Sequence, residues 1–186
     1  MSAYQQIQAG QILLIVCCVF YLIWWGVSFQ PGTEVNREGG YRGLLLLITA
    51  VCGIAGLVLS VIGLNEIPKS SEKLNGAAVA AAGIAAYIVL LLVTGRLLHR
   101  RVTTELVLIT GWTVLELCVI NSLNGAGRLS DPEFFVQCAV IAAAFAVGIV
   151  LYVLYYRMEE HRAFYAAMVP LIADGIAMGV LVFLMI

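Results

Sequence analysis

Residues 43–64 read GLLLLITAVCGIAGLVLSVIGL, and this stretch holds no charged residue. A helix that crosses the hydrocarbon core of a bilayer needs roughly 20 apolar residues, so the stretch is long enough to span it. Lipid offers no hydrogen-bond partner to an open backbone, and the stretch lacks the alternation of polar and apolar residues that barrel strands show. It is therefore predicted to be a transmembrane helix.

Five further apolar runs of similar length flank this stretch, and short polar segments rich in Gly, Pro and Asn separate them, which is typical of turns. The first run is too long for the apolar part of a signal peptide and no Lys or Arg precedes it, so a retained helix is expected. The six predicted helices cover residues 10–29, 43–64, 76–95, 102–123, 134–156 and 163–186. We therefore expect an all-α, polytopic integral membrane protein, with residues 1–186 forming one six-helix transmembrane bundle.

The composition agrees with a membrane protein and excludes several classes of function. Hydrophobic residues make up 62% of the chain and charged residues 11%, whereas soluble domains average about 25% charged residues. With a formal net charge of −1, nucleic acid is not an expected partner. The five cysteines have neither CxxC nor metal-ligand spacing, and there is no Ser–His pairing inside the helices. No metal, cofactor, catalytic residue or enzymatic activity is therefore predicted.

The distribution of Lys and Arg among the loops predicts the orientation. The loops after the first, third and fifth helices hold seven such residues, whereas the other two loops and both tails hold three. The seven are Arg37, Arg42, Arg96, Arg100, Arg101, Arg157 and Arg162, and the three are Lys69, Lys73 and Arg128. Because cytoplasmic loops carry the excess of Lys and Arg, we expect a multi-pass protein of the cell membrane with both termini outside.

The helix pattern is consistent with a duplication of three helices. An offset of 94 residues places Tyr41, before the second helix, on Phe135, at the start of the fifth. Because three crossings are an odd number, two such halves would have opposite orientations and form a 3+3 inverted repeat, which is common in transporters. The alternative is accidental alignment, since six apolar helices with short loops match one another readily.

Two carboxyl groups lie inside predicted helices rather than at their ends: Glu116 in the fourth and Asp174 in the sixth. A carboxylate at mid-membrane costs roughly 2.5–3.5 kcal/mol, so such residues normally face the bundle interior and have a function there. These helices cross in the same direction, and at about 1.5 Å per residue the two acids lie at similar depths. If the helices are neighbours, the acids are expected to share a proton or hold a cation, because two adjacent carboxyls do not both ionise.

Residues around these acids complete a candidate ligand-binding site. Trp112 lies one turn before Glu116 with Thr113 beside it, and an aromatic face next to a carboxylate suits a cation. Asn121 is a possible hydrogen-bonding group toward the far end of the same helix, whereas Gln137 is expected to make an interfacial or interhelix hydrogen bond. Pro170 is expected to kink the sixth helix just before the acid. The predicted ligand-binding residues are Glu116, Asp174, Trp112, Thr113 and Asn121.

These features favour a small membrane transporter or permease whose acidic site binds a proton or a cationic solute. The alternative is a non-transporting membrane protein, such as a lipid-binding protein, a scaffold or a regulatory subunit of a larger membrane complex. Its acids would be structural and would hydrogen-bond neighbouring helices. The expected partners are the lipid bilayer, a small cationic ligand or proton, and either a second copy of the chain or another membrane protein.

Overall fold

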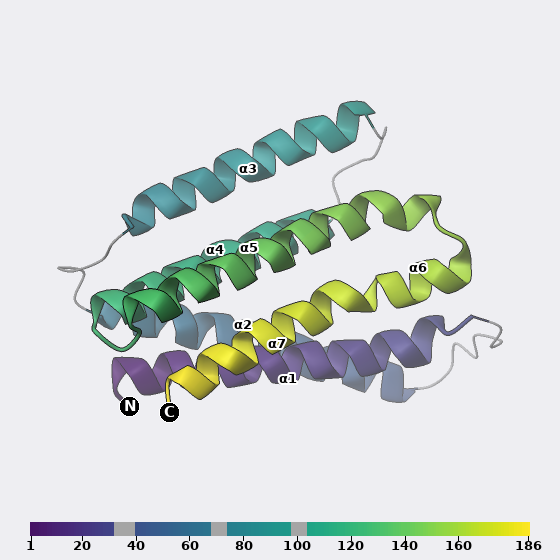
Figure 1. Ribbon diagram of the computed structural model, residues 1–186. Helices are drawn as coiled ribbons and strands as arrows, with labels where there is room; N and C mark the ends of the chain where they lie inside the picture. The colour runs from purple at the N-terminus through teal and green to yellow at the C-terminus, as the bar shows by residue number, and fades with distance from the viewer. Residues whose placement is uncertain (32–39, 68–73, 98–103) are drawn as a thin grey trace. The chain divides into compact units, whose positions relative to one another are not determined.

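The computed structural model describes the chain in four stretches, residues 1–31, 40–67, 74–97 and 104–186. Its elements are α1 (Ala3–Phe29), α2 (Gly40–Glu66), α3 (Gly76–Leu97), α4 (Thr104–Gly125), α5 (Asp131–Leu154), the short 3₁₀ helix η1 (Tyr155–Arg157), α6 (Glu160–Ala166) and α7 (Met168–Leu184) (Figure 1). Within these stretches there is no strand. Six helices are long and apolar enough to cross a membrane, with α6 and α7 together forming the sixth. The predicted all-α architecture with six such helices is confirmed.

Four helices begin earlier than predicted, and polar residues at the helix start explain this for α1 and α5. The first helix begins at Ala3 rather than at residue 10, because Ser2 caps it. The Gln5 backbone N–H donates to Ser2 Oγ at 3.3 Å, and the Ser2 N–H donates back to Gln5 Oε1 at 2.9 Å. At the start of α5, the Ser130 N–H and the Ser130 hydroxyl both donate to Glu133 Oε2, each at 2.7 Å. An apolar run therefore marks the part of a helix that can cross a membrane, whereas the capping pairs mark where it begins. Of the predicted fourth helix, residues 102 and 103 lie outside the described residues.

The sixth predicted helix is interrupted at Ala167, between α6 and α7. Pro170 follows the last residue of α6, Ala166, by four positions. It has no N–H to donate to the Ala166 carbonyl, and its ring crowds that carbonyl. The interruption therefore falls one turn before the proline, at the place where the missing hydrogen bond would have ended. Asp174 lies one turn beyond the proline in α7.

Replacing Pro170 with Ala is expected to join α6 and α7 and to stabilise the protein. The new N–H can bond to the Ala166 carbonyl, which is worth about 1 kcal/mol, or a rise in melting temperature of roughly 2–4 °C in detergent. Pro132→Ala is the matched control, because Pro132 lies in the first turn of α5, where a proline removes no hydrogen bond of the helix. A Pro170→Ala variant that melts at or below the wild-type temperature would contradict this explanation of the break.

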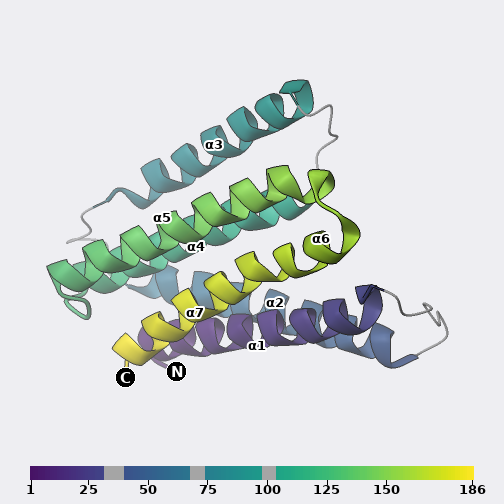
Figure 2. The same ribbon diagram turned by 45° about the vertical axis from the view of Figure 1, so that its right-hand side comes forward.

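The helices form two compact units. The first comprises Met1–Glu66 and Met158–Ile186, and the second comprises Ile67–Arg157. In the first unit α1 packs against α2 and α7, and in the second α4 packs against α3 and α5. The two chain ends both belong to the first unit and lie at the same end of it (Figure 2). The expectation of a single domain stays a prediction.

Small residues allow α1 and α2 to pack closely, and theirs is the most extensive contact between described helices. A β-carbon on Gly56 would lie 2.9 Å from the Gly10 carbonyl oxygen and 2.9 Å from Cγ of Leu14. A β-carbon on Gly63 would lie 2.7 Å from the Ala3 carbonyl oxygen. These distances leave no room for a side chain, so the backbones themselves are in contact. Such close packing is typical of helices that associate in lipid, where no hydrophobic force drives them together.

Candidate functional site

The only buried acid among the acidic side chains that the structure describes is Glu116. Its exposed fraction is 1%, and it lies in the middle of α4. Helix α4 positions it in the second unit, where α3 and α5 pack against that helix. A carboxyl group taken out of water is costly unless another group or a ligand compensates it. Glu116, which the sequence predicts as a ligand-binding residue, therefore lies in an environment that is unusual for an acid.

The contact between α4 and α5 defines which face of α4 carries Glu116. A β-carbon on Gly148 of α5 would lie 3.3 Å from Cγ2 of Ile109 in α4, so these two residues face each other. Glu116 follows Ile109 by seven residues, which is about 20° from two full turns. Gln137 precedes Gly148 by eleven residues, which is about 20° from three full turns. Both side chains therefore start from the α4–α5 interface.

The two residues also lie at neighbouring levels of that interface. Because α4 and α5 form an antiparallel hairpin with Ile109 opposite Gly148, Glu116 is roughly level with Ile141. Gln137 lies about one turn further along α5. It belongs to the buried stripe of α5, whose members are Phe134, Gln137, Ile141, Ala144, Gly148 and Tyr152. An amide is thus placed among apolar residues one turn from the buried acid.

Two polar atoms near Glu116 have no hydrogen-bond partner within the described residues. One is Oε1 of Gln137, whose side chain is 1% exposed. The other is Nε1 of Trp112, one turn before Glu116 on α4. A buried polar group without a partner costs about 1–3 kcal/mol, so both atoms call for a physical explanation.

The sequence predicts that Gln137 makes a hydrogen bond to another helix or at the membrane interface. Its position in the predicted helix is visible in the sequence, but its lack of a partner is not.

Thr113 and Asn121, the other predicted ligand residues of this unit, make hydrogen bonds inside it. Thr113 Oγ1 donates to the Ile109 carbonyl oxygen at 2.8 Å. The Leu74 N–H donates to Asn121 Oδ1 at 2.8 Å, and Asn121 Nδ2 donates to the Leu74 carbonyl oxygen at 2.8 Å. The amide of Asn121 thus pairs with both backbone groups of a residue just before α3. Their roles as ligand residues stay predictions.

Asp174 lies on α7 and belongs to the first unit, whereas Glu116 belongs to the second. Its side chain is partly exposed. Each unit is described by itself, so the predicted pairing of the two carboxyl groups stays a prediction. Across the described stretches, no three His, Cys, Asp or Glu side chains come together in a way that could hold a metal ion.

Comparison with known proteins does not assign the site. The chain matches no protein-family model, no curated protein and no solved structure, so its function has to be inferred from its own residues.

Proposed function

We propose that the chain is a small transporter or permease of the cell membrane that moves a proton or a cationic solute. The observation that carries the proposal is the burial of Glu116 in a helix able to cross a membrane. Acids in such helices are expensive, and they typically mark proton relays or pathways for cations. Asp174, one turn after the proline of the interrupted sixth helix, is the second acid in the proposal, because broken helices often form the substrate sites of transporters.

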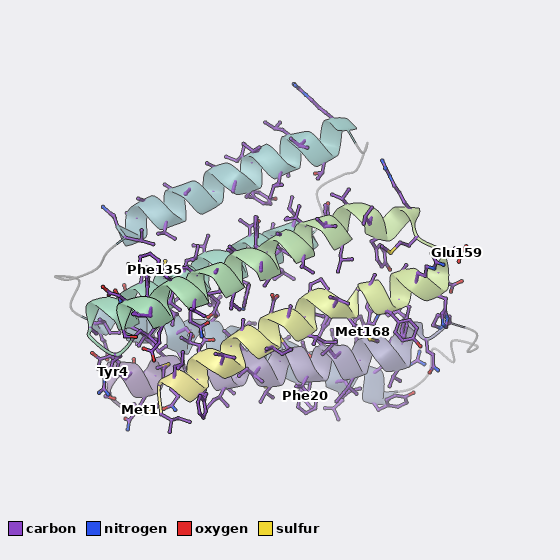
Figure 3. All side chains as sticks on the ribbon, viewed as in Figure 1. Met1, Tyr4, Phe20, Phe135, Glu159 and Met168 are labelled. Atoms are coloured by element: carbon purple, nitrogen blue, oxygen red, sulfur yellow. The ribbon has the colours of Figure 1, made fainter. Side chains whose placement is uncertain are left out.

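The surface of the helices supports the membrane placement. Large apolar side chains project outward along them (Figure 3), and among the most exposed are Ile54, Leu108 and Phe135, at 65%, 69% and 64%. Water tolerates such surfaces poorly, whereas lipid covers them at no cost. Both termini are proposed to lie outside, and six crossings return the chain to the side on which it started. Of the residues behind this orientation, Arg37, Lys69, Lys73, Arg100 and Arg101 lie outside the described residues.

The contacts within the two units support a 3+3 inverted repeat. The offset of 94 residues pairs α1 with α4, α2 with α5, and α3 with the interrupted sixth helix. In the first unit, α1 contacts α2 and the sixth helix, and in the second unit α4 contacts α5 and α3. Each unit therefore has a hairpin from one half and the third helix of the other half. We propose that the two halves are related by this exchange.

Flux measurements on protein reconstituted in liposomes test the proposal. Wild-type protein is expected to move protons, or one member of a panel of ammonium and alkali cations, faster than empty vesicles do. The Glu116→Gln variant should lose at least about 90% of this flux, because a neutral amide neither carries a proton nor attracts a cation. Glu159→Gln is the matched control, since Glu159 is an exposed acid before α6. Asp174→Asn tests the second acid separately.

The outcomes separate transport from the alternative function. Wild-type flux equal to that of empty vesicles for the whole panel, or full flux in Glu116→Gln, would contradict the proposal. The remaining candidate would then be a non-transporting subunit or lipid-binding protein. The hydrogen bonds of Thr113 and Asn121 within their own unit favour that alternative, because they show polar groups that serve to join helices.

A further inference from the structure

We infer that the α4–α5 interface holds a site for a small organic ammonium ion that also carries a hydrogen-bond acceptor, bound by Glu116, Gln137 and Trp112. The inference rests on the proposed function and specifies its substrate class. It starts from two buried atoms near Glu116, Gln137 Oε1 and Trp112 Nε1, which have no hydrogen-bond partner among the residues that the structure describes. A buried polar atom without a partner is costly, and a ligand that bonds to both atoms would remove that cost.

The three side chains start close to one another. Trp112 and Glu116 share one side of α4 at a spacing of four residues, which places their β-carbons about 6 Å apart. Gln137 reaches the same interface from α5, one turn from the level of Glu116. All three belong to the second unit, so the site depends on a single helix hairpin.

The hydrogen-bonding character of the groups determines the ligand class. The amide oxygen of Gln137 accepts a hydrogen bond, and the carboxylate of Glu116 accepts hydrogen bonds and supplies a negative charge. Together they suit a primary ammonium group, which has three N–H donors and a positive charge. A bare proton would engage only the carboxyl and leave Gln137 without a partner.

Trp112 adds a second requirement. Its indole N–H can only donate, so the ligand needs an acceptor such as a hydroxyl or carbonyl oxygen a few atoms from its ammonium group. The face of the same indole ring attracts cations. An amino alcohol of ethanolamine size satisfies both conditions, whereas ethylammonium lacks the acceptor and tetramethylammonium lacks every N–H donor.

Ligand-dependent melting of the purified full-length protein in detergent tests the inference, because a ligand that binds the folded state raises its melting temperature. Ethanolamine is the probe, with ethylammonium, tetramethylammonium and Na⁺ as comparisons. We expect ethanolamine to bind most tightly and Gln137→Leu to weaken it about 10-fold or more, since a hydrogen bond to a charged group is lost. Trp112→Phe should weaken ethanolamine while leaving ethylammonium nearly unchanged, because Phe keeps a ring but lacks the N–H.

The design separates binding from folding and from transport. Without ligand, Gln137→Leu should melt no lower than wild type, because Leu removes a buried oxygen that has no partner among the described residues. Gln8→Leu makes the same change at a partly exposed glutamine in α1 and is the control for ligand binding. Equal ethanolamine affinity in wild type and Gln137→Leu, or no stabilisation of wild type by ethanolamine, overturns the inference. If Glu116-dependent proton flux persists in that case, the proposed function stands without it. Ethanolamine binding that Gln137→Leu loses, in a protein that moves neither ethanolamine nor any cation of the flux panel, supports the site and overturns the transport proposal.

Discussion

A Gly56→Leu variant is expected to lose about 3 kcal/mol or more of stability, at the upper end of the range for overpacking. This corresponds to a fall in melting temperature of roughly 6–12 °C in detergent. A β-carbon at this position would already lie 2.9 Å from the Gly10 carbonyl oxygen. The obstacle is backbone rather than a flexible side chain, so α1 and α2 would have to move apart. Because packing contacts are what join helices in lipid, separation should weaken the whole first unit.

Gly43→Leu is the control for this experiment. It places the same side chain in the same helix, but a β-carbon on Gly43 meets nothing within 4 Å. The variant should melt at or slightly above the wild-type temperature, because Leu favours helix more than Gly does. Gly56→Ala should give an intermediate loss. Equal melting temperatures for Gly56→Leu and Gly43→Leu would show that the close α1–α2 contact does not stabilise the protein.

An Asn121→Leu variant is expected to loosen the start of α3 and to cost about 2 kcal/mol. The substitution removes both hydrogen bonds to Leu74, each 2.8 Å long, and leaves two partly buried backbone groups without partners. Amide hydrogen exchange followed by mass spectrometry should show faster exchange in peptides from the first turns of α3. Peptides from α1 and α2 should exchange as in wild type.

Asn121→Asp refines this test, because it keeps an acceptor for the Leu74 N–H and removes the donor to its carbonyl. Its exchange rates should fall between those of wild type and Asn121→Leu. Unchanged exchange in α3 for the leucine variant would mean that the amide does not hold this segment. That result would favour the predicted ligand role of Asn121, because its side chain would not be needed to hold α3.

The lengths and identities of the helices could be predicted because they depend on one property, the number of consecutive apolar residues. Short connections favour contacts between sequential helices, but which faces meet, and that α1 also packs against α7, could not be predicted, because six apolar runs resemble one another. The pairing of α1 with α2 depends on Gly10 meeting Gly56, a match between two faces that becomes visible only once the helices are side by side. The break at Ala167 was foreseeable in kind from Pro170, although it falls a turn earlier than the proline itself.

The residues of the candidate site also differ in how far the sequence could predict their roles. Glu116 and Trp112 were visible because a charge and an indole stand out within an apolar run. Gln137 is also visible as an amide within an apolar run, but a sequence does not show whether an amide finds a partner. In the sequence, Thr113 and Asn121 are equally suitable as ligand residues. Their bonds to Ile109 and Leu74 depend on backbone positions that the sequence does not specify.

The first unit joins helices from both ends of the chain, and this has a consequence for the biosynthesis of the protein. Its α1 packs against α7, and the Trp25 indole donates to the Phe164 carbonyl oxygen across 139 positions of the chain. After α2 emerges from the ribosome, residues 67–159 must still be made, which takes about 5–20 s. During that time the side of α1 that will meet α7 has no partner of its own chain. If the chain is inserted into a bilayer as proposed, lipid or the insertion machinery has to cover that side of the α1–α2 hairpin until α7 is made.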